Sequence, residues 1–381
     1  LSVAYMPGVA RVCKAIAEDR LKAFDLTLKR NMVAVITNGT AVLGLGDIGA
    51  AAGMPVMEGK SMLFKEFGDV DSYPICIDSK DAEVLIEAIA AIAPAFGGIN
   101  LEDIAAPECF LIEEMLRARL DIPVFHDDQH ATSVIVCAGL LNALELQAKF
   151  LPDARIVLQG AGAAGLATMK LLIELGAKRE NMVLLDRVGV VHPGRPDLNI
   201  YKRRYAQITD KRTLTDAMQN ADAFIGVSAP NMVSPEMVAS MAPKPVVFAL
   251  ANPDPEISPE IANGVRADLI MATGRSDYPN QVNNVLVFPY IFRGALDVHA
   301  SSVSRPMLVG AVRALAKLAH EPVATEVLRA YGLGHLQYGP DYIIPKPLDP
   351  RLIHVVPPAV AKAAVDSGVA RAGYPAHYPP P

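Results

Sequence analysis

The chain has 381 residues, of which 51% are hydrophobic and 20% charged, and its formal net charge is −6. This length is sufficient for two domains with hydrophobic cores. The negative charge argues against nucleic acid or an anionic membrane surface as the main partner. Four scattered cysteines without CxxC spacing predict reduced thiols and a cytoplasmic location. The longest apolar stretch, residues 133–144, is too short to span a bilayer and predicts a buried helix.

The N-terminal third mixes short strands with amphipathic helices. Residues 32–36 and 41–43, separated by Asn38-Gly39, predict a β-hairpin, and residues 81–92 predict a helix. A GxGxxG run follows the hairpin, and Pro55 stands so close behind it that we expect no full helix to follow. We therefore interpret this run as a loop beside the active site that can touch the nicotinamide half of a cofactor. Its residues are Gly44, Gly46, Asp47 and Gly49.

Two acidic pairs, Glu102-Asp103 and Asp127-Asp128, each follow an apolar segment. Carboxylates placed at the ends of apolar segments converge on one point only if a cation balances them. Oxygen ligands without Cys-His spacing favour Mg²⁺ or Mn²⁺ over Zn²⁺. The alternative is that these acids cap helices.

The middle third contains a strand, a glycine turn, a helix, a second strand and an acid in that order. Residues 154–158 are the first strand, residues 166–175 the helix with Gly176 as its cap, and residues 182–185 the second strand, which ends at Asp186. This order is typical of the dinucleotide-binding unit, whose helix N-terminus faces the pyrophosphate. The predicted turn residues are Gly160, Ala161, Gly162, Ala163, Ala164 and Gly165.

Three more strands at α/β spacing extend this unit. They are residues 223–227, 246–251 and 269–272, with helices near 214–219 and 235–241 between them. Ligands of such sheets bind at the carboxyl ends of the strands, which here carry Ser228, Asn252 and Thr273-Gly274. Helices are predicted over residues 295–320 and 358–367, and we expect them to pack back on the N-terminal part.

The predicted fold is therefore α/β with three parts. Residues 1–130 form an N-terminal α/β domain for substrate and metal, and residues 131–294 form a doubly wound, Rossmann-type domain for NAD(P). Residues 295–381 form a helical segment and linker.

Six motifs in chain order resemble malic enzymes of the bacterial type. They are residues 2–10, 44–49, 55–60, 100–103, 126–130 and 283–289. Ala131 departs from the family, which usually has Gly after His-Asp-Asp-Gln-His. The resemblance implies oxidative decarboxylation of L-malate to pyruvate and CO₂, with reduction of NADP or NAD. The long bacterial form continues into a phosphotransacetylase-like domain, and the proline-rich residues 374–381 are compatible with a linker to one.

The resemblance also implies roles for individual residues. Glu102, Asp103 and Asp128 would bind the metal, and Lys60 and Tyr5 would transfer protons. The chemistry adds that Lys60 needs a pKa lowered toward neutrality to act as a base, and that Asp127 can hold it by a hydrogen bond. Neutral amide donors for the distal carboxylate of the substrate are predicted at Asn252, Asn283 and Asn284.

The cofactor prediction depends on the end of the second strand. Asp186 suits the ribose diol of NAD, whereas Arg187, Arg195 and Lys202 suit a 2′-phosphate. Lys202 resembles the lysine position of NADP-preferring members, so NADP is predicted and NAD stays an alternative. The family suggests dimers in which Tyr5 and Lys60 reach one site from different subunits.

Three other functions remain open from the sequence. A malolactic enzyme would use the same architecture but release lactate and keep its NAD. A regulatory module would bind a nucleotide or acyl-CoA without turnover. An amino-acid dehydrogenase would share the domain order but has no use for three metal carboxylates.

Overall fold

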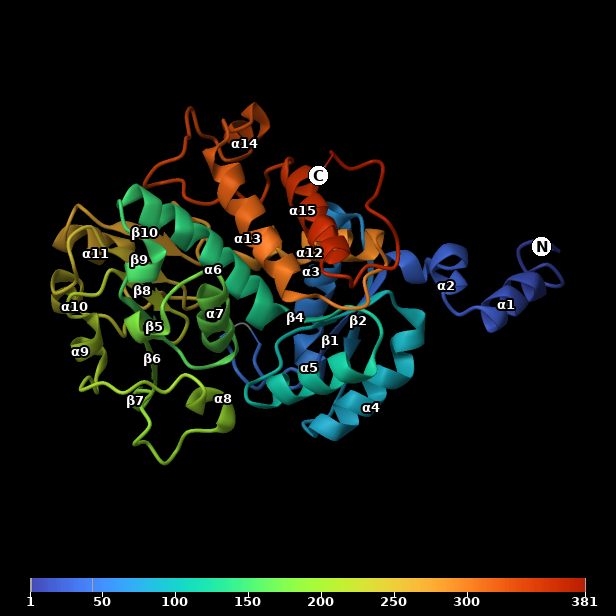
Figure 1. The fold of residues 1–381 in the computed structure, drawn as a ribbon, viewed down its shortest axis with the longest axis horizontal. Coiled ribbons are helices and arrows are strands. Elements are labelled where there is room, and N and C mark those ends of the chain that lie inside the picture. The colour runs from blue at the N-terminus through green and yellow to red at the C-terminus, as the bar shows by residue number, and fades with distance from the viewer. Residues whose placement is uncertain (1, 43, 381) are drawn as a thin grey trace.

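The protein is described here by a computed structural model that covers residues 2–42 and 44–380. Within these ranges the strands form two sheets, one of four strands in the order β2-β1-β3-β4 and one of six in the order β10-β9-β8-β5-β6-β7 (Figure 1). All neighbouring strands are parallel except β6 and β7. This confirms the predicted α/β class with a Rossmann-type sheet.

Helices alternate with the strands of the smaller sheet. The elements are β1 (Met32–Thr37), α3 (Ala50–Gly68), β2 (Asp71–Cys76), α4 (Ala82–Ile92), β3 (Gly98–Leu101), α5 (Glu108–Arg119) and β4 (Val124–His126). The predicted hairpin over residues 32–43 is wrong, because parallel strands β2 and β3 occupy both edges of β1. Val42 makes only an isolated bridge to Gly46, and Leu43 lies outside the described residues.

The prediction that Pro55 leaves no room for a helix is also wrong. Helix α3 begins directly after Gly49 and continues through Pro55 to Gly68. A proline inside a helix costs roughly 3 kcal/mol because it removes one hydrogen bond and crowds the preceding turn. Burial of Met57 and Phe64, both without exposed surface, offsets this cost at about 1.5–3 kcal/mol for each side chain.

The larger sheet follows the predicted strands to within a few residues. Its elements are β5 (Ile156–Gln159), α7 (Ala163–Glu174), β6 (Met182–Asp186), β7 (Gly189–Val190), α8 (Ile200–Arg203), α9 (Leu214–Met218), β8 (Ala223–Gly226), α10 (Pro235–Ala239), β9 (Val246–Ala249), α11 (Pro259–Val265) and β10 (Ile270–Thr273). After β7 the chain crosses to the other side of β5 and forms β8. The strand order therefore reverses between β5 and β8, which is where such sheets bind ligands.

Long helices connect the two sheets. They are α6 (Asp127–Leu146), α12 (Phe288–Asp297), α13 (Arg305–His320) and α15 (Leu352–Asp366), with the short α14 (Thr325–Ala330) between the last two. The predicted C-terminal helices do pack back, since α12 contacts α3 of the first sheet and α15 packs on α12 and α13. The predicted boundaries after residues 130 and 294 fall inside α6 and α12.

The single helix predicted over residues 295–320 is wrong. Helix α12 ends at Asp297, His299 has a left-handed backbone with φ +46°, and α13 begins at Arg305. Pro306 lies in the first turn of α13, where its missing N–H costs nothing. Among the described helices, none has the length and apolar character needed to cross a membrane.

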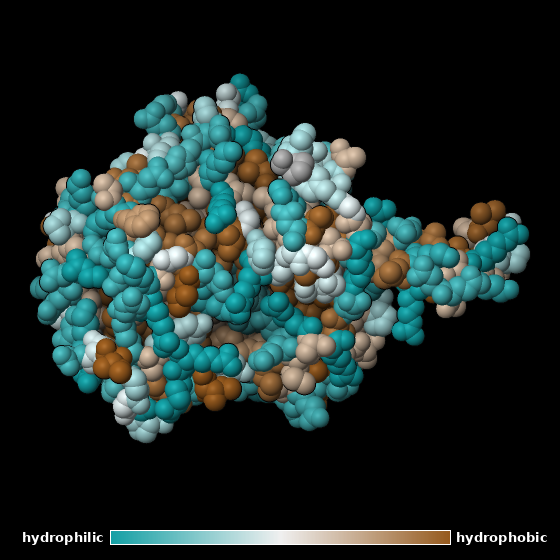
Figure 2. Space-filling view, viewed as in Figure 1, coloured by the Kyte–Doolittle hydropathy of each residue, from teal (hydrophilic) through white to brown (hydrophobic). Residues whose placement is uncertain are grey.

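The N-terminal segment projects from the body as an arm, consisting of residues 2–26 with α1 (Val9–Glu18) and α2 (Lys22–Leu26) (Figure 1). Helix α1 has no buried residue, although its apolar side chains are strongly gathered on one face. Brown, hydrophobic side chains stand on the arm in Figure 2. The most exposed are Val3, Tyr5, Met6, Leu21 and Leu26. An amphipathic helix without a core of its own needs a partner surface.

The close approach of α7 to β5 gives a prediction about stability. A Cβ on Gly165 would lie 1.7 Å from the Gly160 carbonyl oxygen, whereas a Cβ on Gly162 meets no atom within 4 Å. We expect Gly165→Ala to destabilise the protein by about 1–3 kcal/mol through overpacking. Gly162→Ala is the matched control and should unfold like the wild type. Thermal unfolding without cofactor measures both, and equal midpoints for the two variants would contradict the prediction.

Candidate active site

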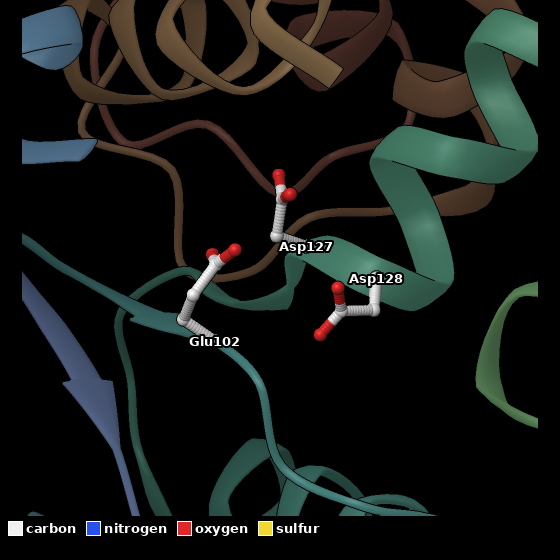
Figure 3. Close-up of side chains that lie close together, drawn as sticks. All are labelled: Glu102, Asp127 and Asp128. Carbon is white, nitrogen blue, oxygen red and sulfur yellow. The ribbon is translucent and has the colours of Figure 1, made fainter. Parts of the chain in front are cut away.

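The parallel pairing of β3 with β4 brings the two acidic pairs together. Leu101 lies opposite His126 in the register, so the next residues, Glu102 and Asp127, leave neighbouring strands side by side. Asp127 and Asp128 form the first turn of α6. Figure 3 shows Glu102, Asp127 and Asp128 gathered at this point, and each offers one oxygen within 4.8 Å of the others.

Lys60 lies between two of these acids. Helix α3 carries it, and its Nζ is 2.7 Å from Glu102 Oε1 and 2.6 Å from Asp127 Oδ2. Lys60 and Glu102 are nearly buried, and Asp127 has no exposed surface. The ammonium also lies over the Phe288 ring, 4.3 Å from its centroid. Charge-assisted hydrogen bonds of this kind hold the ammonium at a fixed position.

Amide side chains hold the carboxylates. Asn100 Nδ2 donates to Glu102 Oε2 at 3.0 Å, and Asn284 Nδ2 donates to Asp127 Oδ2 at 2.8 Å. The Asn284 amide oxygen accepts a hydrogen bond from Thr132 Oγ1 at 3.1 Å. Glu102 and Asp127 are therefore each oriented by an amide as well as by Lys60.

The electrostatic balance of this cluster is negative. Burial raises the pKa of Glu102 strongly, Lys60 opposes that effect, and the neighbouring acids raise it further. Burial likewise raises the pKa of Asp127 more than Lys60 lowers it. Burial lowers the pKa of Lys60, but the two carboxylates outweigh it and leave that pKa above its ordinary value. The carboxylates of Glu102 and Asp127 thus favour the ammonium form of Lys60.

The residues present fit a divalent cation. The Lys60 ammonium pairs with Glu102 and Asp127, and Asp128 offers a further oxygen within 4.8 Å of theirs. Among the described residues, Asp127 Oδ1 is buried without a hydrogen-bond partner. The observed oxygen group contains Asp127, whereas the predicted ligand set contains Asp103. Asp103 is nearby: it is buried with a left-handed backbone (φ +52°), and its N–H donates to Asp128 Oδ2 at 3.0 Å.

The predicted dinucleotide turn joins β5 to α7. Gly160 has φ +117° and lies so close to β8 that a Cβ would be 2.6 Å from the Val227 carbonyl oxygen. Gly162 precedes α7, and the space beside it is open. The remaining predicted residues, Ala161, Ala163, Ala164 and Gly165, complete this turn and the first turn of the helix. The free N–H groups at this helix end suit a pyrophosphate.

Asp186 at the end of β6 is held by two cations. Arg195 Nη1 and Nη2 contact its two oxygens at 2.8 and 3.0 Å, and Lys202 Nζ contacts Oδ2 at 2.7 Å. Burial raises the pKa of Asp186, but hydrogen bonds from Arg195 and Lys202 outweigh it and bring the pKa to about 2. Arg187 is exposed and contributes nothing to this cluster among the contacts of the described residues.

The other predicted residues lie on separate loops. Ser228 follows β8 and Asn252 follows β9, and Asn252 is exposed. Asn283 Oδ1 accepts a hydrogen bond from the Val285 N–H and caps a short 3₁₀ helix, and its role as an amide donor to the substrate stays a prediction. A Cβ on Gly44 would be 2.6 Å from the Asn252 carbonyl oxygen. The glycine loop of the first domain therefore touches the second domain at Asn252.

The rest of that loop is exposed. Gly46 has φ +77° and Gly49 φ +85°, both in the left-handed region. Asp47 pairs with Lys80 Nζ at 2.5 Å, also on the surface. Within the described residues, the contact of this loop with the second domain is the approach of Gly44 to Asn252.

Tyr5 is not brought to Lys60 within this chain. Its side chain is 69% exposed on the arm, which points away from both sheets (Figure 1). Sequence reasoning also missed Asn100 and Phe288, which contact Glu102 and Lys60. Asn100 could have been found, since residues two apart on a strand share one face.

Two α/β domains, a dinucleotide turn and an acid-lined lysine are together typical of nicotinamide-dependent dehydrogenases. Residues 1–117 match the family described as Malic enzyme, N-terminal domain, and residues 129–329 match Malic enzyme, NAD binding domain. The chain belongs to the malic enzyme family.

Individual relatives agree with this assignment. The chain is 56% identical over 379 residues to the NADP-dependent malic enzyme of Halomonas elongata, covering 100% of this chain and 90% of that protein. It is 56% identical over 372 residues to that of Escherichia coli, covering 97% of this chain but 49% of the relative. The NAD-dependent malic enzyme of Rhizobium meliloti is 53% identical, with 97% and 48% covered.

Solved structures show the same fold. The malic enzyme of Pyrococcus horikoshii superposes with a TM-score of 0.90 at 44% identity, covering 98% of this chain and 85% of that one. That of Thermotoga maritima gives 0.87 at 44% identity, with 95% and 92% covered.

Proposed function

We propose that this protein oxidises L-malate and decarboxylates the product to pyruvate and CO₂ while reducing NADP. The observation that carries the proposal is the Lys60 ammonium held at 2.6–2.7 Å from Asp127 and Glu102, with Asp128 beside them. A 2-hydroxy acid needs a proton acceptor at its hydroxyl group and positive charge near the oxygen that becomes a carbonyl.

Lys60 is the proposed base for the C2 hydroxyl proton as hydride leaves C2 for the nicotinamide. The two carboxylates and the Phe288 ring fix the position of its Nζ. A divalent cation would be held by Glu102 and Asp128 together with Asp103 or Asp127, and it would supply Lewis-acid stabilisation of negative oxygen. Because such a cation shares the same carboxylates, it weakens their pull on the Lys60 proton.

Three asparagine amides lie on the elements proposed to surround the substrate. Asn284 already donates to Asp127, so its main role is to orient that carboxylate. Asn252 is exposed at the end of β9 and is free to donate to the distal carboxylate of malate. Asn283 caps the neighbouring 3₁₀ helix through its oxygen, which leaves its amide N–H groups for the substrate.

Tyr5 is the proposed proton donor to C3 after CO₂ leaves, and we propose that it acts in the site of a second copy. The arm carries Tyr5 away from Lys60 of its own chain and exposes apolar side chains that a second copy would cover. Closed dimers bury the same patch on both subunits, so each arm would complete the other site.

NADP is the proposed cofactor, with NAD as the alternative. Arg195 already pairs with both oxygens of Asp186, so Lys202 can turn from Asp186 to a 2′-phosphate without leaving the acid unpaired. Ser228 lies at the strand reversal where the dinucleotide would lie.

Two broader expectations belong to the same proposal. A cytoplasmic location fits the use of a soluble nicotinamide cofactor. The chain spans 49% of the Escherichia coli relative and 90% of the Halomonas relative, and a long form with a phosphotransacetylase-like domain is part of the proposal.

The reaction itself is the first prediction here. With L-malate, NADP and Mn²⁺ we expect net formation of NADPH with an equal amount of pyruvate, and loss of both when the metal is chelated. Absorbance of the reduced nicotinamide and a pyruvate assay measure this. Lactate without net NADPH would identify a malolactic enzyme instead, and nucleotide binding without either product would indicate a regulatory module.

The choice of cofactor gives a second prediction. Lys202→Gln should raise the KM for NADP about tenfold, because one charged hydrogen bond to the phosphate is lost, and leave the KM for NAD nearly unchanged. Lys178→Gln, which removes a surface cation paired with Asp153, is the control. An unaltered NADP/NAD ratio in Lys202→Gln would refute the role of this lysine.

The shared site gives a third prediction. Tyr5→Phe and Lys60→Ala should each be nearly inactive alone, while co-refolded mixtures should regain about a quarter of wild-type activity, since half the dimers are mixed and each has one intact site. Mixing Tyr5→Phe with the double variant is the control and should restore nothing. If Tyr5 served its own chain, the first mixture would stay inactive as well.

A further inference from the structure

Glu256 is a buried acid that the proposed chemistry does not use. It lies in the loop after β9 and has no exposed surface. Its Oε1 accepts hydrogen bonds from the Ser228 N–H at 2.9 Å and the Ser228 hydroxyl at 3.2 Å, and its Oε2 accepts one from the Ala251 N–H at 3.1 Å. One carboxylate thus joins the ends of two neighbouring strands, β8 and β9.

The surroundings are shaped around this carboxylate. A Cβ on Gly226 would lie 2.4 Å from Glu256 Cδ, so only glycine leaves room at the end of β8. Backbone hydrogen bonds also join the two loops. The Asn231 N–H donates to the Pro255 carbonyl oxygen at 3.1 Å, and the Val233 N–H donates to the Glu256 carbonyl oxygen at 3.0 Å. The loops after β8 and β9 are therefore held together along their length.

A stabilising role alone explains this arrangement poorly. Burying a carboxylate is expensive, and neutral or apolar groups usually serve a core as well or better. Burial raises the pKa of Glu256, and the Ala251 and Ser228 N–H groups oppose that rise. Three donors around its two oxygens fix the orientation of the carboxyl group.

The two loops that Glu256 joins carry residues of the proposed cofactor and substrate site. Ser228 is bonded to it directly, and Asn252 follows the bonded Ala251. Asn252 also closes the space beside two glycines: a Cβ on Gly44 would lie 2.6 Å from its carbonyl oxygen, and a Cβ on Gly274 would lie 3.0 Å from its Oδ1. We infer that Glu256 is a positioning residue, which holds Ser228 and Asn252 at the spacing that binds the nicotinamide dinucleotide at the reversal between β5 and β8. This inference rests on the proposed function.

The Glu256→Gln variant tests whether the hydrogen bonds of Glu256, and not only its size, matter for cofactor binding. Glu256→Gln has the same size, but its NH₂ group must face either the Ser228 or the Ala251 N–H, so at least one connection is lost. The matched control is Asp222→Asn at the opposite end of β8. Asp222 accepts hydrogen bonds from Lys149 at 2.7 Å and from the Arg155 N–H at 2.9 Å, and likewise joins strands of this sheet.

The test measures NADPH binding by fluorescence without malate, together with the thermal midpoint and the KM for NADP. We expect Glu256→Gln to raise the NADPH dissociation constant and the KM for NADP about tenfold. Asp222→Asn should lower the thermal midpoint about as much as Glu256→Gln does, but leave the NADPH dissociation constant within about twofold of the wild-type value. Equal NADPH affinity in the wild type and Glu256→Gln would overturn the inference and leave Glu256 a structural residue.

Two further measurements keep the inference testable. If Glu256→Gln does not fold, two other measurements replace it. Ser228→Ala removes only the hydroxyl hydrogen bond to Glu256, and amide hydrogen exchange in the wild type reports on the Ser228 and Ala251 N–H groups. NADP should slow exchange of both amides, and unchanged exchange would count against positioning. A wild type that binds no NADPH would instead refute the proposed function, which distinguishes the two failures.

Discussion

The parallel register between β3 and β4 is the constraint on which the candidate site depends. Leu101 opposite His126 delivers Glu102 and Asp127 to the same edge of the sheet. Their charges repel, so backbone hydrogen bonds of the sheet, and not the acids, set this geometry. A slip of one residue would turn Asp127 to the other face and separate it from Lys60.

The cost of this arrangement is offset by the hydrophobic core around it. Taking carboxylates out of water costs several kcal/mol for each ion, and the attraction of one ammonium recovers only part of it. The largest apolar cluster joins β1, α6 and α12 beneath the acids, and it includes Val35, Phe125 and Phe288. The helices that carry Lys60 and Asp127 are thus anchored by burial, while the carboxylates beside Lys60 carry more negative charge than its ammonium balances and suit a cation.

Local patterns were enough to predict much of this molecule. The dinucleotide turn, its flanking strands and the acids after β3 and β4 follow from short apolar runs ended by Gly or acidic residues. Pairing between distant strands does not follow from such patterns: the run over residues 32–36 looked like half of a hairpin, but β2 and β3 pair with it. Pro55 misled for a related reason, since a local penalty was outweighed by burial that only the assembled fold supplies. The observed place of Asp127 in the oxygen group depends on side-chain directions that spacing does not specify.

The two domains also meet through backbone atoms. Gly44 reaches the Asn252 carbonyl so closely that no side chain fits between them, and its φ of +74° suits glycine. After Gly49 the same loop becomes α3, which carries Lys60, while Asn252 follows the strand end that Glu256 holds. The contact therefore connects the helix of the proposed base with the loops of the proposed cofactor site. The glycine spacing that resembles a dinucleotide turn is therefore part of the contact between the two domains.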